Sequence, residues 1–228
     1  MERNIYVSNK NWSEIRDLIE GEQIEIGPYF GHQIRNSPRH LLFTLSRYKF
    51  ASRMLPQNKK IRILEIGCSE GVGTQVLGEM GSSITAIDED AQAIAQAQKT
   101  FNKPNIKFIS GNFIGRDIGT FDAAVSLDVI EHIDTKQEDA FIQTIKNNLT
   151  PEGLCIIGTP NDAATQYASK ASQIGHINMF TAERLNECLQ KHFTHVFMFG
   201  MNDEIVHTGF YPMCHYLMAI ACMPREQI

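Results

Sequence analysis

From residue 59 onward, short apolar runs alternate with stretches of helical spacing, and this alternation limits the possible folds more than any other feature of the chain. Apolar runs of this length are typical of buried strands. We predict strands at residues 61–66, 83–87, 106–109, 121–127, 153–158, 193–199 and 214–222. Strands that alternate with helices form a parallel sheet covered on both faces. The prediction is therefore an α/β fold, a doubly wound and mostly parallel sheet of seven strands.

The first 58 residues follow a different pattern. We expect a short amphipathic helix over 11–19, a loop at 27–32, and a second helix that begins at Ser37-Pro38 and ends near Leu55. Serine as N-cap followed by proline is a common helix start. We interpret residues 1–58 as a helical lid or substrate segment and residues 59–228 as the main domain.

Composition excludes several classes of protein. The net charge of −5 and the lack of a lysine/arginine stripe argue against a nucleic acid partner. No apolar run approaches the roughly 20 residues that span a bilayer, and the polar N-terminus lacks a signal-peptide core. The five irregularly spaced cysteines are typical of reduced thiols. We expect a cytoplasmic monomer or homodimer with no membrane partner.

A glycine turn, Gly67 to Gly71, follows the first strand and opens a helix. Glycine permits positive φ and close approach of the backbone to a ligand. Dinucleotide binding would need G-x-G-x-x-G, but Ser69 stands at the second glycine position and would obstruct a pyrophosphate. A ligand-free tight turn is another interpretation of the segment alone.

The same turn also matches the nucleophile-elbow pattern G-x-S-x-G of serine hydrolases, with Ser69 as the nucleophile. The elbow normally follows several strands and an upstream oxyanion segment, and this chain has neither before residue 67. An aspartate with His207 or His215 could still complete a triad. The hydrolase therefore stays as an alternative.

Adenosyl binding fits the turn better. Glu65 precedes the first glycine by two residues, the glycines are spaced G-x-x-x-G, and Asp88 ends the second strand. A carboxylate at that position can accept hydrogen bonds from both ribose hydroxyls. A ligand without a pyrophosphate also makes Ser69 less obstructive.

In combination, several segments resemble the class I S-adenosylmethionine (SAM)-dependent methyltransferases. These segments are Leu64 to Gly71, Ala86 to Asp88, Phe121 to Ile133, Leu149 to Gly153 and Thr159 to Asn161. They are most similar to the small-molecule group that includes the ubiquinone-biosynthesis O-methyltransferases and many sugar and natural-product methyltransferases. The resemblance covers about residues 60–190.

The resemblance implies SAM as cofactor and a role for each matching residue. The cofactor-binding set is Glu65, Gly67, Cys68, Ser69, Gly71, Asp88, Asn112, Phe113 and Leu127. Within it, Glu65 and Gly67 face the methionine part, Asp88 holds the ribose, and Asn112 and Phe113 contact the adenine. Two positions depart from the family. Asn112 replaces an aspartate, and Ser69 replaces a glycine, which costs about 1–2 kcal/mol if the site needs positive φ.

Two histidines are candidate general bases for a hydroxyl acceptor. His132 follows the fourth strand and is the first candidate, and His176, before the helix capped by Thr181, is the second. His132 could equally bond a backbone carbonyl and cap the next segment. Tyr29 and His32 are candidate lid residues, although their loop could be a simple packing turn.

Asp128, Glu131 and His132 resemble the metal-binding spacing proposed for the ubiquinone O-methyltransferases. Surface carboxylates are the simpler interpretation, and we expect no metal requirement. The Asn-Pro-Pro-aromatic signature of amino-directed DNA methyltransferases is absent after the fourth strand. The expected reaction is methyl transfer to a small molecule, at a hydroxyl oxygen of a sugar-linked or phenolic metabolite. A non-catalytic SAM-binding protein is a further alternative.

Overall fold

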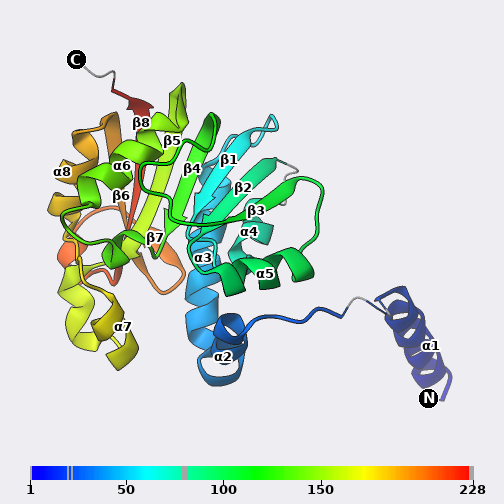
Figure 1. Cartoon of the computed structure of the whole chain (residues 1–228). Helices are drawn as coiled ribbons and strands as arrows, with labels where there is room; N and C mark the ends of the chain where they lie inside the picture. Colours follow the sequence, from blue (N-terminus) through cyan, green and yellow to red (C-terminus); the bar gives the residue numbers. More distant parts are fainter. Residues whose placement is uncertain (1, 20, 22, 79–81, 226–228) are drawn as a thin grey trace.

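Eight strands form one sheet in the computed structural model, which describes residues 2–19, 21, 23–78 and 82–225 (Figure 1). Their order across the sheet is β3-β2-β1-β4-β5-β8-β6-β7. The strands are β1 (Arg62–Ile66), β2 (Ser83–Asp88), β3 (Ile106–Ser110), β4 (Phe121–Leu127), β5 (Leu149–Pro160), β6 (Phe193–Asn202), β7 (Ile205–His207) and β8 (Tyr216–Pro224). The first five pair in parallel, whereas β8 runs antiparallel to both β5 and β6. The predicted doubly wound α/β fold is confirmed.

The sheet has one strand more than the seven predicted. The extra strand, β7, is three residues long and pairs with the end of β6 as a hairpin at the edge of the sheet. A strand this short shows no clear period of two in its sequence, so its pairing could only be seen in the folded chain.

Helices cover both faces of the sheet (Figure 1). The helices of the described residues are α1 (Glu2–Ile19), α2 (Pro28–Asn36), α3 (Pro38–Met54), α4 (Val72–Leu77), α5 (Ala91–Thr100), α6 (Glu138–Asn147), α7 (Lys170–Gly175) and α8 (Ala182–Gln190), with short 3-10 turns η1 (Ile130–His132), η2 (Asp162–Tyr167) and η3 (Tyr211–Met213). Residues of α3, α4 and α5 pack on one face, and residues of α6 and α8 on the other. No helix in the described part of the chain combines the length and the apolar character needed to cross a membrane.

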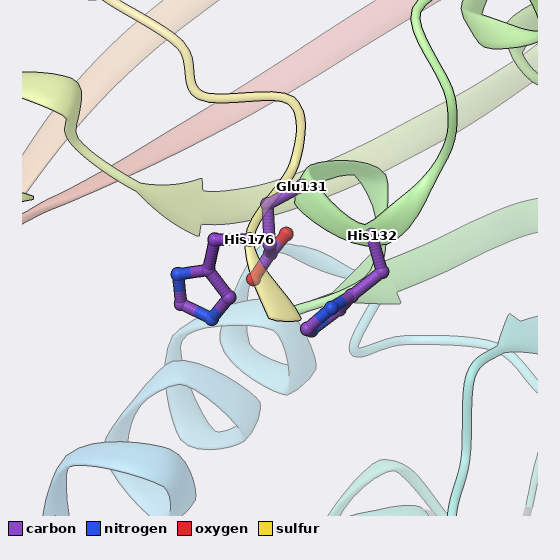
Figure 2. Close-up of side chains that lie close together, drawn as sticks. All are labelled: Glu131, His132 and His176. Atoms are coloured by element: carbon purple, nitrogen blue, oxygen red, sulfur yellow. The ribbon is translucent and has the colours of Figure 1, made fainter. Parts of the chain in front are cut away.

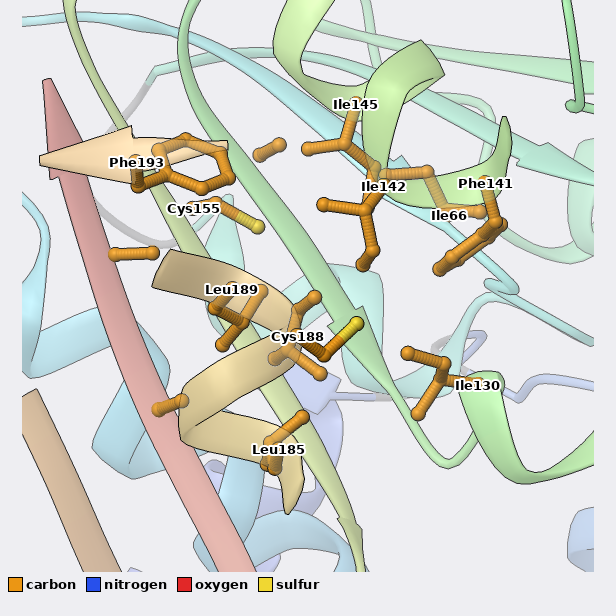
Figure 3. Close-up of a cluster of buried hydrophobic side chains, with 14 of the residues drawn as sticks. Ile66, Ile130, Phe141, Ile142, Ile145, Cys155, Leu185, Cys188, Leu189 and Phe193 are labelled. Atoms are coloured by element: carbon orange, nitrogen blue, oxygen red, sulfur yellow. The ribbon is translucent and has the colours of Figure 1, made fainter. Parts of the chain in front are cut away.

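The central strands carry the core. All of β1 except Arg62 is buried, and β4 is buried at all but one position, because helices cover both of their faces. Figure 3 shows one of the two clusters, in which Phe141 and Ile142 of α6 and Leu185 of α8 meet the sheet. Each such aliphatic or aromatic side chain contributes about 1.5–3 kcal/mol when it is fully buried. These clusters therefore hold the central strands rigidly, together with the start of each loop that follows them.

The local prediction for residues 27–32 was wrong. The expected loop is mostly helix, since α2 begins at Pro28. Glycine at the N-cap position offers no side-chain acceptor for the first N–H groups, so the local pattern lacked the usual signal of a helix start.

Other local predictions are confirmed. The Oγ1 of Thr181 accepts a hydrogen bond from the Arg184 N–H and caps α8. The strand prediction at 121–127 matches β4 residue for residue.

The chain runs from β1 to β2 and β3 on one side, then crosses to β4 and β5 on the other. Ligands in such sheets bind at this switch point, beyond the carboxyl ends of the strands.

Candidate active site

A cavity of about 340 Å³ opens at this switch point, between the carboxyl ends of β1, β2 and β4. Seven of the predicted cofactor-binding residues line it: Gly67, Cys68, Ser69, Asp88, Asn112, Phe113 and Leu127. Tyr29, Phe30, Thr44 and Tyr48 from the N-terminal helices complete another part of its wall. Its size is in the range of small-molecule sites.

The turn after β1 has three residues with positive φ, namely Gly67 (78°), Ser69 (48°) and Gly71 (78°). A Cβ on Gly67 would lie 2.2 Å from Cγ2 of Val129, so no side chain fits there. Ser69, which replaces the usual glycine, adopts the left-handed conformation, and this costs about 1–2 kcal/mol. Gly71 faces Phe108 rather than the cavity.

Asp88 holds this turn in place. Its Oδ2 accepts a hydrogen bond from the Ser69 N–H at 2.8 Å, and its Oδ1 accepts one from the Asp90 N–H at 2.9 Å. The carboxylate is thereby fixed on the cavity wall, and each oxygen keeps a lone pair for a further donor. This geometry suits a ligand that offers two hydroxyl groups.

Asn112 and Phe113 follow β3. The Asn112 Oδ1 accepts a hydrogen bond from the Ile114 N–H at 2.8 Å, which leaves its amide nitrogen for a ligand. Phe113 is buried and contacts Phe141 edge to face, with ring centroids 5.7 Å apart. The pair gives the cavity a polar group beside an aromatic wall.

Glu65 is buried on β1 and does not line the cavity. Neither carboxylate oxygen has a hydrogen-bond partner of normal geometry among the described residues. Burial raises the pKa of Glu65 to about 7, although the nearby Thr74 and Tyr48 hydroxyls oppose this rise. A buried carboxyl that only these two hydroxyls approach is costly to ionise, and a cationic group nearby would favour its charged form.

The turn after β4 contains an ion pair that the sequence pattern did not reveal. Nη1 of Arg47, on α3, donates to both oxygens of Asp128 at 2.7 and 2.8 Å. The guanidinium also stacks on the ring of Tyr216, with its Cζ 3.8 Å from the centroid. Asp128 has a φ of 58° and lines the cavity. The sequence offered only a weak signal, an arginine within a helix whose other buried residues are uncharged.

Glu131, His132 and His176 converge from two segments beside the cavity (Figure 2). Glu131 is fully buried; its Oε2 accepts a hydrogen bond from the Thr159 hydroxyl at 3.0 Å, and its Oε1 has no partner among the described residues. Burial raises the pKa of Glu131 to about 8, and the negative charge of Asp128 adds to the rise.

The two imidazoles contact each other edge to face, with ring centroids 5.0 Å apart. Nδ1 of His132 lies 2.8 Å from the Gly175 carbonyl oxygen. A carbonyl only accepts, so Nδ1 carries the proton and Nε2 is left as an acceptor. The backbone-bonded arrangement and the role of base are therefore compatible. Burial lowers the pKa of His176, which does not itself line the cavity.

The group that could hold a metal differs from the predicted one. One ligand atom each of Glu131, His132 and His176 lies within 4.8 Å of the others. Asp128, which the sequence grouped with Glu131 and His132, is bound to Arg47 instead. His176 takes its place because the loop before α8 returns to η1, where the Ile177 and Asn178 N–H groups donate to the Glu131 carbonyl.

Three other predicted residues take different positions. His32 is exposed, and its ring contacts Asn36 one helical turn later, outside the cavity. His207 is on β7, at the far edge of the sheet from β1, and His215 precedes β8. Neither histidine lines the cavity with Ser69, so no triad forms and the hydrolase interpretation loses its support.

Comparison with known proteins gives a consistent result. A family model described as a methyltransferase domain matches residues 32–192. The chain is 33% identical over 116 residues to the mitochondrial ubiquinone biosynthesis O-methyltransferase of Bos taurus, a match that covers 47% of this chain and 31% of the relative. It is 30% identical over 115 residues to the ubiquinone biosynthesis O-methyltransferase of Rickettsia akari, a match that covers 48% and 44%. The chain thus spans less than half the length of either relative.

Among solved structures, the N-methyltransferase NodS of Bradyrhizobium japonicum in complex with S-adenosylhomocysteine has a similar fold. The TM-score is 0.58 at 22% identity, and the alignment covers 82% of this chain and 87% of NodS. At this identity the likeness concerns the fold alone.

Proposed function

The chain belongs to this methyltransferase family, and on that premise we propose that it transfers a methyl group from SAM to a hydroxyl oxygen of a small molecule. The observation that carries the proposal is the shared cavity. It combines the strained turn and Asp88 on one side with the free Nε2 side of His132 on the other. The first group is suited to hold a nucleoside, and the second to accept a proton.

The residues present fit SAM. Asp88 would hold the ribose hydroxyls, and Asn112 and Phe113 would contact the adenine. Glu65, which lies on β1 behind the cavity wall, would neutralise the ammonium group of the methionine part where that group reaches it. Gly67 has no side chain, and Val129 fills the space where one would lie, so the turn presents its backbone to the cavity.

SAM, when bound, supplies a methyl group that its sulfonium already activates. The work left to the protein is to align the acceptor, exclude water and remove a proton. We assign proton removal to Nε2 of His132, with Nδ1 held by the Gly175 carbonyl. His176 lies beside this ring and would support it. The reaction so described requires no metal.

The choice of oxygen rests on the relatives that match in sequence, which are named as O-methyltransferases, whereas NodS is named as an N-methyltransferase. The small-molecule acceptor, sugar-linked or phenolic, is part of the proposal. We further propose that residues 1–58 act as the lid, because α2 and α3 supply part of the cavity wall.

Calorimetric titration with S-adenosylhomocysteine tests the cofactor site. Replacing Asp88 by alanine should weaken binding about 10- to 100-fold, since charge-assisted hydrogen bonds contribute about 1.5–3 kcal/mol. Asp90→Ala, which removes the exposed cap of α5, is the matched control and should bind normally. If the wild-type protein does not bind this ligand, the proposed function is wrong.

Turnover with a panel of phenols and sugars tests the base. His132→Ala should lower turnover about 10²- to 10⁴-fold and leave S-adenosylhomocysteine affinity nearly unchanged. His195→Ala, an exposed histidine on β6, is the control. Unchanged turnover would show that His132 is not the base.

Two further outcomes concern the proposed function as a whole. Binding without turnover on any acceptor would favour a non-catalytic SAM-binding protein. A loss of turnover in EDTA that Mg²⁺ restores would contradict the metal-free reaction.

A further inference from the structure

Glu70, in the turn after β1, binds the start of α2 through its side chain. Its Oε1 accepts a hydrogen bond from the Tyr29 N–H at 2.8 Å, and its Oε2 accepts one from the Phe30 N–H at 3.0 Å. The side chain is buried, with 3% of the residue exposed. Its neighbours Ser69 and Gly71 both have positive φ, and this backbone directs the Glu70 side chain toward α2.

This carboxylate serves as the cap of α2. The helix has glycine at its N-cap position and no acidic residue in its first turn, so it lacks a local acceptor for its first N–H groups. A carboxylate at a helix N-terminus also interacts favourably with the helix dipole. The start of α2 therefore depends on a residue 40 positions later in the chain.

Gly27 is adapted to this contact. A Cβ built on Gly27 would lie 2.2 Å from Oε1 of Glu70, so any side chain at this position would displace the carboxylate. The backbone of Gly27 has a φ of −72°, which every residue type can adopt. The glycine is therefore required for space rather than for conformation.

The capped end of α2 is part of the cavity wall, through Tyr29 and Phe30. One turn later, Gln33 is buried, and neither atom of its amide has a hydrogen-bond partner of normal geometry among the described residues. The Gln33 side chain instead interacts with the Tyr29 side chain and does not line the cavity, so Tyr29 and Phe30 are the residues of α2 that face the ligand space. By contrast, α3 is held firmly, through Arg47 on Asp128 and through Tyr48 against Gly73.

We propose that Glu70 is a positioning residue that couples the cofactor turn to α2, so that a ligand on the turn orders Tyr29 and Phe30 for the acceptor. The inference rests on the proposed function, since it takes the turn to be the cofactor site. A ligand that contacts residues 67–69 restricts the backbone of the turn, and this backbone sets the direction of the Glu70 side chain. Because such coupling is reciprocal, the free energy by which the ligand favours an ordered α2 equals the free energy by which an ordered α2 strengthens ligand binding. Cofactor would then bind before the acceptor.

Amide hydrogen exchange with and without S-adenosylhomocysteine tests this coupling. In the wild-type protein, the ligand should slow exchange at residues 28–36 about tenfold. In Glu70→Ala this ligand-dependent change should disappear, and in Glu70→Gln, which keeps only one acceptor oxygen, it should shrink. Glu152→Ala, an exposed glutamate on β5, is the control.

Gly27→Ala provides an independent variant, because it displaces the carboxylate without altering Glu70 itself. It should also lose the ligand-dependent change, whereas Gly31→Ala, which has open space, should keep it. Should Glu70→Ala fail to fold, Gly27→Ala and Glu70→Gln decide the question. Ligand binding with equal slowing at residues 28–36 in all variants would overturn the coupling. No binding by the wild-type protein would instead overturn the proposed function.

Discussion

Ser69 shows how a single residue can retain strain at a binding turn. Its φ of 48° is the left-handed conformation, which costs an L-residue about 1–2 kcal/mol. The hydrogen bond from its N–H to Asp88 and the glycines on either side hold it there. The same strain could serve the site, because it directs the N–H at the residue that we assign to the ribose.

We expect Ser69→Gly to raise the free energy of unfolding by about 0.5–1 kcal/mol. Relief of the left-handed strain outweighs the extra chain entropy that glycine adds to the unfolded state. Urea denaturation measures the change. Ser69→Ala keeps Cβ and the strain, so it serves as the control, and equal stability of the two variants would show that the turn is not strained.

At the scale of elements, the contact between α3 and α4 decides how the N-terminal helices join the sheet domain. Gly73 of α4 lies under the ring of Tyr48, and a Cβ there would be 2.1 Å from the Tyr48 Cζ. The absence of a side chain at Gly73 is what allows the two helices to approach so closely.

Gly73→Ala should therefore lower the free energy of unfolding by about 1–3 kcal/mol through overpacking, even though alanine favours helices. Gly31→Ala, inside α2, is the matched change at an open position and should raise it by about 0.5–1 kcal/mol. Thermal or urea denaturation of both variants is the measurement. If both stabilise the protein, the close approach of α3 and α4 has no energetic importance.

For the whole molecule, two buried carboxyl groups make stability depend on pH. Burial raises the pKa of Glu65 to about 7 and that of Glu131 to about 8, both above the value of 4.5 in an unfolded chain. The folded state therefore binds more protons than the unfolded state above pH 4.5. The stability due to these groups is fully present below that pH and is lost as pH rises toward 8.

We expect the free energy of unfolding to fall between pH 5 and pH 8, and the fall to be smaller in Glu65→Gln/Glu131→Gln. Urea denaturation at several pH values gives the two slopes. Glu152→Gln changes an exposed carboxyl and should keep the wild-type slope. Equal slopes for the wild-type and the double variant would show that neither group keeps its proton in the folded protein.

The sequence by itself determined the order of strands and helices and the place of the cofactor turn. These follow from local patterns, because continuous apolar runs predict buried strands, and chemistry follows the strands at their carboxyl ends. Asp88 and His132 were identified in this way, Asn112 and Phe113 were implied by the resemblance to the methyltransferases, and all four line one cavity.

Only the tertiary structure decided which polar groups meet. Glu70 caps α2 across 41 positions of sequence, and Arg47 holds Asp128 across 81. The third partner of Glu131 and His132 is His176 for the same reason, since the loop before α8 returns to η1. Hydrophobic periodicity records which face of an element is buried. It carries no record of which distant side chain lies opposite, because packing of the complete sheet brings those segments together.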